Sequence, residues 1–199
     1  MKLIKEYIIN EKFTDESDPI NDMGIGLKYL IKKWLNNHNV KDNNYIINND
    51  GSIDIFNNLN LLGNGVEKFP KYINFNYIKG NCTICYFKVD SITGILKNIG
   101  GYLNFMNTNL KRIDFLPEIL TELPANYAGG NGYAFSNNKL ITLEGLPEIL
   151  NCSLWINNNP FKTLRYLPKK INGYLFIDRR FSENQIRRVC DVKKTITLV

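Results

Sequence analysis

Apolar residues return at intervals of about 20 along most of this chain. The most regular unit runs from Tyr133 to Pro147, where apolar Tyr133 and Phe135 flank the small residue Ala134. Two apolar positions around one outward position are typical of a short strand. An asparagine, three apolar residues spaced three apart and a proline complete the unit. The same frame predicts strands that begin at Leu59, Cys82, Leu103, Tyr133, Leu154 and Leu175.

The spacings between these starts are 23, 21, 30, 21 and 21 residues. A period of this length with this pattern is typical of leucine-rich repeats, which stack their strands side by side. We therefore predict an α/β repeat fold, a short leucine-rich-repeat solenoid with one parallel sheet. Proline follows the apolar triplet in several repeats, which places it on an irregular return side and outside the sheet.

The turn after each strand has a recurring polar position. Asn64, Asn138 and Asn159 occupy it in three repeats, and Phe87, Thr108 and Arg180 occupy it in the others. Because an asparagine there can bond to backbone groups of neighbouring turns, we expect a partial asparagine ladder.

The 30-residue repeat contains extra residues near 121–130, with the composition of a loop. Such insertions often bind partners. A tolerated bulge is the alternative that we favour.

The two ends differ from the repeats, and we divide one compact domain into 1–58, 59–181 and 182–199. In the first part, Leu27, Ile31 and Trp34 belong to an amphipathic helical pattern, and a hairpin is expected over 45–55. These would form an N-terminal cap of helix plus hairpin. In the last part, Ser182 and Gln185 form a capping box that opens a short helix, and a final strand follows at 195–199. This helix and strand would form the C-terminal cap.

Composition indicates a soluble globular protein of 199 residues, with 44% hydrophobic and 22% charged residues. No apolar run approaches the roughly 20 residues that span a bilayer. The first ten residues are too polar for a secretory signal. We expect a cytosolic location, no membrane association, and four cysteines present as free thiols.

Candidate chemistry is sparse. Cys82 and Cys85 have the spacing of a zinc or redox motif, but residues three apart on a strand point to opposite faces, so core packing is favoured. His38 is the single histidine and follows the predicted helix. The acidic stretch at 15–22 lacks the spacing of an EF-hand. We predict no catalytic residue, no metal site and no cofactor, and therefore not an enzyme.

An aromatic patch is expected on the outer face of the sheet, near its C-terminal end. Trp155 and Phe176 lie at outward positions of their strands, and Tyr174, Tyr102 and Asn157 flank this row. Exposed aromatic clusters mark interaction sites. The alternative is that a terminal segment covers them.

Positive charge is concentrated in the last 40 residues. The chain has a net charge of +6, whereas residues 160–199 contain ten Lys or Arg and three acids, a net of +7, so the rest carries −1. Arg179 and Arg180 join the aromatic residues as predicted partner-binding residues. Such a surface suits an acidic protein or single-stranded nucleic acid, or it is a solvated end that keeps the protein soluble.

The chain resembles leucine-rich-repeat proteins of tailed bacteriophages, including large phages with AT-rich genomes. The resemblance lies in residues 12–26, in the repeats from 59 to 173, and in the ending from 181 to 192. It implies a phage origin, a host-cytoplasmic or virion-associated location, and an interaction role without catalytic residues. The 30-residue repeat and the turn residues Phe87, Thr108 and Arg180 depart from the family pattern.

We therefore expect a non-catalytic interaction module. Its partner would be a host or phage protein that contacts the sheet face and the basic C-terminal end. A nucleic-acid-binding protein and a structural component of the virion or its assembly are the alternatives.

Overall fold

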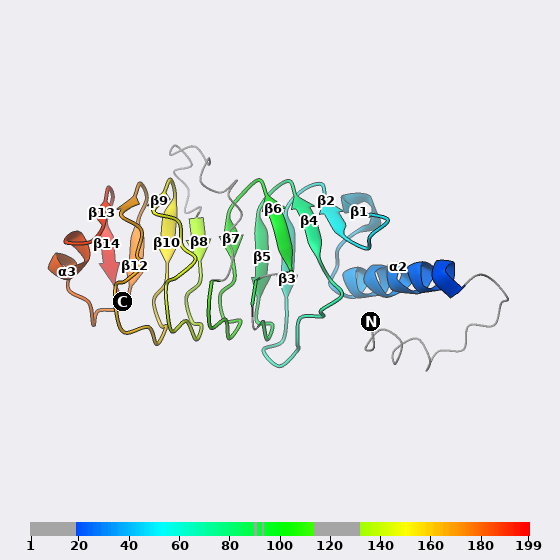
Figure 1. The fold of residues 1–199 in the computed structure, drawn as a ribbon, viewed down its shortest axis with the longest axis horizontal. Helices are drawn as coiled ribbons and strands as arrows, with labels where there is room; N and C mark the ends of the chain where they lie inside the picture. The colour runs from blue at the N-terminus through cyan, green and yellow to red at the C-terminus, as the bar shows by residue number, and fades with distance from the viewer. Residues whose placement is uncertain (1–18, 90, 93, 114–131) are drawn as a thin grey trace.

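The computed structural model describes residues 19–89, 91–92, 94–113 and 132–199. This part of the chain winds into an elongated β-solenoid of about six turns (Figure 1). The predicted loop at 121–130 and most of the acidic stretch at 15–22 lie outside the described residues.

One parallel sheet of seven strands runs along the solenoid. Its spatial order follows the chain, because each turn adds its strand next to that of the turn before. The six predicted strand starts all belong to it, and the predicted final strand is its seventh member. The strands are β3 (Leu59–Leu62), β5 (Cys82–Cys85), β7 (Leu103–Asn104), β8 (Gly132–Ala134), β10 (Ser153–Trp155), β12 (Leu175–Ile177) and β14 (Ile196–Leu198).

Two smaller sheets run beside it, and the sequence pattern did not indicate most of their strands. Apart from the β1–β2 hairpin, they form where described segments that precede strands of the large sheet pair in parallel with the same segment of the next turn. The return path is therefore less irregular than predicted. One sheet holds β1 (Tyr45–Ile47), β2 (Ile53–Ile55), β4 (Phe75–Ile78) and β6 (Leu96–Ile99), and the other holds β9 (Ile149–Leu150), β11 (Lys170–Ile171) and β13 (Asp191–Val192).

Helical segments lie at both ends, in the regions where the sequence predicts them. Helix α2 (Pro19–Asn37) and the short 3-10 helix η1 (Asp42–Asn44) lead into the antiparallel β1–β2 hairpin, which confirms the hairpin. Helix α3 (Glu183–Arg187) begins at the predicted capping box, because the Ser182 hydroxyl accepts from the Gln185 N–H and the Gln185 side chain accepts from the Ser182 N–H. No helix in the described ranges offers an apolar stretch of the length that a membrane span requires.

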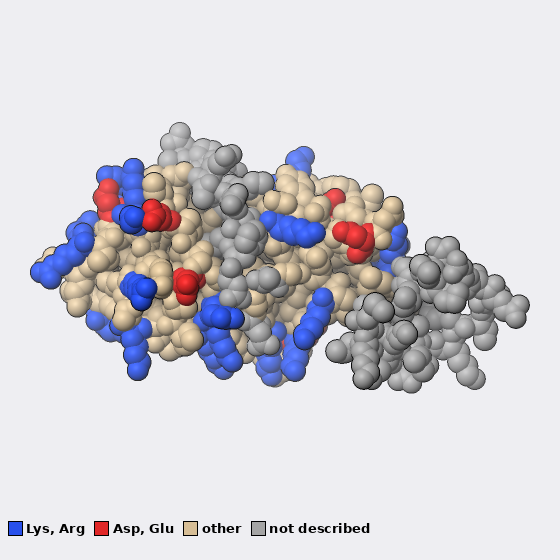
Figure 2. All heavy atoms as spheres, viewed as in Figure 1, with Lys and Arg blue, Asp and Glu red and all other residues tan. Residues whose placement is uncertain are grey.

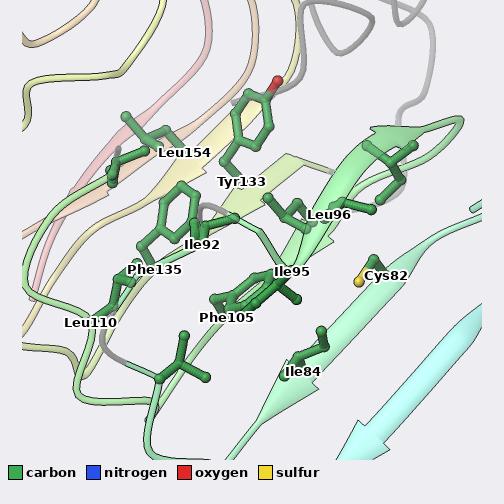
Figure 3. Packing of buried hydrophobic residues seen from close by; sticks show 14 of the residues in the cluster. Cys82, Ile84, Ile92, Ile95, Leu96, Phe105, Leu110, Tyr133, Phe135 and Leu154 are labelled. Atoms are coloured by element: carbon green, nitrogen blue, oxygen red, sulfur yellow. The ribbon is translucent and has the colours of Figure 1, made fainter. Parts of the chain in front are cut away.

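A continuous apolar core fills the solenoid. Tyr133 and Phe135 are almost fully buried, and their rings stack with centroids 6.2 Å apart. Figure 3 shows these rings beside Leu154 of the next turn and Phe105 of the previous one. Burial of side chains from successive turns stabilises the stack, because a turn alone has no partner for its apolar edge.

Asparagine side chains connect successive turns, as predicted. Asn138 accepts hydrogen bonds from the N–H groups of Thr108 and Leu110 at 2.8 and 3.1 Å, and it donates to the carbonyls of Phe105 and Phe135 at 2.6 and 3.0 Å. Asn159 repeats this arrangement one turn later. Asn64 instead bonds within its own turn. The ladder is therefore partial.

Candidate functional site

The outward row of the large sheet lies where the sequence predicts it. Strand register pairs the outward residue of each strand with that of the next, and Thr197 of β14 extends the row by one position. The Thr197 position follows from the same 21-residue period, but the prediction ended the row at Phe176. The complete row is Asn60, Thr83, Asn104, Ala134, Trp155, Phe176 and Thr197.

Trp155 and Phe176 form the aromatic centre of this row. Their rings are nearly parallel, at an interplanar angle of 12°, with centroids 5.3 Å apart. Both side chains are half-buried. On the other side of Trp155, the outward positions of strand β8 hold Gly132 and Ala134, and Ala134 is the residue that pairs with Trp155. A large aromatic surface therefore adjoins the smallest side chains of the sheet.

Tyr174 lies immediately before β12, one residue away from this row. Its side chain is exposed, and the Lys194 ammonium lies 4.9 Å from its ring centroid. Its N–H donates to the Ser153 hydroxyl at 3.1 Å, which fixes the start of β12 on β10. A cation above an aromatic ring is attracted to the π face. Sequence reasoning counted Lys194 in the basic C-terminal end but did not connect it with Tyr174, although Lys194 stands one period after Gly173, the neighbour of Tyr174.

Tyr102 and Asn157 flank the row but do not belong to one cluster. Tyr102 precedes β7, which β8 separates from β10 and Trp155. Asn157 follows β10 and accepts a 2.6 Å hydrogen bond from the Ser136 hydroxyl. The structure thus brings Trp155, Phe176 and Tyr174 into the same region and leaves Tyr102 two strands away from Trp155.

The Arg180 side chain has several contacts within the protein. Its guanidinium forms an ion pair with Asp178 at 3.0 Å and donates to the Asn159 carbonyl. It also lies over the rings of Phe161 and Phe181, at 5.0 and 5.2 Å. Arg180 therefore connects two turns at the position where other repeats place asparagine. If Arg180 also binds a partner as predicted, the partner would contact the part of its side chain that remains exposed.

Other cations of the C-terminal region are exposed at the surface. Arg179 is exposed, and its N–H donates to the Val199 carbonyl at 2.9 Å. Ion pairs join Lys169 to Glu148 and Lys193 to Asp191, both at 2.7 Å. Figure 2 shows Lys and Arg atoms at the left end of the molecule, where α3 and β13 lie. Because exposed pairs of this kind are weak, these cations stay available to a partner.

The cysteines show no arrangement suited to chemistry. Cys82 lies in the core, and Cys85 is buried on the other side of β5, as the spacing predicts. Burial raises the pKa of both thiols, which keeps them protonated and poorly nucleophilic. Within the described part of the chain, no group of three or more His, Cys, Asp and Glu side chains could hold a metal ion.

His38 lies just beyond the end of α2, as predicted, and has a structural environment. Its Nδ1 is 2.8 Å from the Trp34 carbonyl oxygen, and its Nε2 is 3.3 Å from a Glu67 carboxylate oxygen. Its ring lies 4.1 Å from that of Trp34, measured between centroids. These contacts hold the end of the helix against the first turn of the solenoid.

No protein-family model, curated protein or solved structure matches this chain.

Proposed function

We propose that this protein is a non-catalytic interaction module of the leucine-rich-repeat type, encoded by a phage. It binds a host or phage protein through the outer face of the large sheet and the basic C-terminal end. The observation that carries this proposal is the stacked pair of Trp155 and Phe176, two half-buried aromatic rings at outward positions of the sheet.

The repeat type is supported by three features that occur together. Strand starts recur at a 21-residue spacing, the strands pair in parallel, and Asn138 and Asn159 bond neighbouring turns in the same way. Residues 1–58 and 182–199 would act as caps. Ile31, Trp34 and Leu35 of α2 and Ile186 of α3 support this role, because their side chains are buried in the core.

An extended sheet face suits protein recognition better than small-molecule chemistry. Interfaces concentrate their binding energy in a few aromatic and arginine residues at their centre. Trp155, Phe176 and Tyr174 provide such a centre, and Lys194 and Arg179 add positive charge beside it. The complementary partner surface would be apolar in the middle and acidic at its rim. A phage protein of this kind would act in the host cytoplasm or associate with the virion.

The test is affinity capture from phage-infected cells, followed by titration of the captured partner in purified form. Replacing both Trp155 and Phe176 with serine should weaken binding at least tenfold, which corresponds to about 1.4 kcal/mol. The matched control replaces Asn60 and Thr83, at the other end of the same row, with serine and should bind like the wild type. Unchanged binding by a folded W155S/F176S variant would overturn the proposal.

A second candidate function is binding of single-stranded nucleic acid. The contact of Lys194 with Tyr174 favours it, since cations interleaved with aromatic rings provide charge and stacking together. A mobility-shift titration with an oligothymidylate at about 50 mM salt should show binding that weakens steeply by about 200 mM. Absence of a shift at the lower salt concentration excludes this candidate. A virion or assembly component is the third candidate, and mass spectrometry of purified particles decides it.

A further inference from the structure

Strand β14 has one unpaired edge. It is the terminal strand of the seven-stranded sheet and pairs with β12 alone. The Thr195 carbonyl accepts from the Leu175 N–H at 3.1 Å, and the Val199 N–H donates to the Ile177 carbonyl at 2.9 Å. Alternate residues of a parallel strand direct their backbone groups to opposite sides. The N–H and C=O groups of Ile196 and Leu198 therefore point away from β12, where the described residues supply no further strand.

Other elements lie beyond the opposite edge of the large sheet. At the far end of the same sheet, Figure 1 places α2 and the β1–β2 hairpin beyond β3, and Trp34 of α2 packs against Phe69 at 5.4 Å between ring centroids. At the C-terminal end, the Arg187 guanidinium reaches the Val192 carbonyl of β13 at 3.5 Å. Among the described residues, no strand pairs with the outer edge of β14.

The sequence of β14 lacks the usual protection of an edge strand. Natural edges carry charges, prolines or bulges that prevent unwanted pairing. The segment from Ile196 to Val199 has none of these in its sequence or its pairing register. Leu198 and Val199 are 38% and 41% exposed, so their apolar surface is accessible along the edge.

The surroundings of this edge are basic. Residues 178–199 contain six Lys or Arg and three carboxylates, a net charge of +3. Lys193 and Lys194 come just before β14 in the sequence, and Arg188 follows α3. An incoming strand with negative charge would be attracted, whereas a second copy of this chain would bring another basic end against the first.

We propose that β14 binds an extended acidic segment of a partner protein, which adds an eighth strand to the large sheet. This proposal rests on the proposed function and specifies a second contact for the same partner. Backbone hydrogen bonds to Ile196 and Leu198 supply affinity, and alternate side chains supply specificity. Apolar side chains of the segment would continue the core beyond Ile196 and Leu198, and acidic ones would continue the outer row beyond Thr197.

A pair of variants at one position tests the edge. Leu198→Pro removes only an outward N–H, which has no partner in the sheet, so the ladder to β12 is kept. Leu198→Ala is the matched control, because it shortens the same side chain and keeps the N–H. Thermal unfolding checks that both variants are folded. The probe is a fluorescein-labelled peptide of alternating glutamate and valine, and its binding is followed by fluorescence anisotropy.

Wild type and Leu198→Ala should bind the glutamate–valine peptide, and Leu198→Pro should bind it at least tenfold more weakly. A lysine–valine peptide should bind none of the three. Equal binding of the first peptide by the proline and alanine variants would overturn pairing at this edge. Equal binding of both peptides would overturn the acidic specificity.

Two further measurements separate this proposal from its alternatives. The W155S/F176S variant should still bind the glutamate–valine peptide, because the peptide contacts only the β14 edge. Loss of the aromatic face as a binding site can therefore be distinguished from loss of binding at the edge. Sedimentation of the wild type should show a monomer across the concentrations used. If the wild type is instead a dimer and Leu198→Pro dissociates it, the β14 edge binds a second copy of this chain. That result would overturn the proposal of an acidic partner segment.

Discussion

Tyr86 has a backbone conformation that tyrosine rarely adopts. Its φ is +61°, whereas the same turn position in three later repeats holds Asn107, Asn137 and Asn158, with φ between +57° and +58°. Asparagine tolerates this left-handed region because its short polar side chain can bond locally. Asn158 also donates to the Asn137 side chain at 2.8 Å. Burial of the Tyr86 side chain offsets little of this conformational cost, since the residue is 48% exposed.

We predict that Tyr86→Asn raises the free energy of unfolding by about 1 kcal/mol, because the strained conformation then falls on a residue that tolerates it. Urea unfolding followed by circular dichroism measures this. The reciprocal change, Asn137→Tyr, should lower the free energy by a similar amount. Destabilisation by Tyr86→Asn would show that the tyrosine ring contributes more than its backbone conformation costs.

At the level of the repeating turn, buried asparagines hold neighbouring turns together. Asn138 is 7% exposed and bonds to groups of two turns, whereas Asn64 is exposed and bonds only to the N–H groups of Val66 and Glu67. Loss of a buried partner leaves backbone groups unsatisfied, at about 1–3 kcal/mol each. The same residue type therefore has two different energetic roles in this fold.

Asn138→Ala should lower the free energy of unfolding by about 2 kcal/mol or more, because the buried N–H groups of Thr108 and Leu110 lose their acceptor. Asn64→Ala is the matched control and should cost about 1 kcal/mol or less. Chemical denaturation of both variants gives the comparison. An equal loss of unfolding free energy in Asn138→Ala and Asn64→Ala would contradict the view that the asparagine ladder connects neighbouring turns.

The repeated strands could be predicted from the sequence because each has two buried positions around one outward position. Leu154 and Ile156 flank Trp155 in this way, and the period then aligns Trp155 with Phe176. Short strands such as β11, with two residues, contain no alternation to read. They form because stacked turns bring like segments together. The contacts of Arg180 with Phe161 and Phe181 likewise arise from stacking and leave no local pattern.

At the scale of the whole molecule, one core runs through every turn and contains ionisable groups that burial keeps neutral. Burial raises the pKa of the Cys152 and Cys190 thiols to about 12, and it is the main cause that raises the pKa of Tyr45 to about 12. In the unfolded chain a thiol titrates near its ordinary pKa of 9.0. The folded protein therefore holds protons that the unfolded chain releases as the pH rises.

This difference predicts the direction of the pH dependence. The stabilisation is fully present below about pH 9 and is lost as the pH rises toward 12, since the unfolded state binds fewer protons there. Each such thiol lowers the free energy of unfolding by at most about 1.4 kcal/mol per pH unit in that window. Urea midpoints measured under reducing conditions should thus be flat near neutral pH and fall above about pH 9.

Cys152→Ala isolates one of these groups. It removes a single buried thiol, so the alkaline slope of its unfolding free energy should be shallower than that of the wild type by up to about 1.4 kcal/mol per pH unit. Lysines and exposed tyrosines titrate in both proteins, and their effect cancels in the difference between the two slopes. Identical slopes would mean that the Cys152 thiol ionises as readily in the folded solenoid as in the unfolded chain, in conflict with its burial between turns.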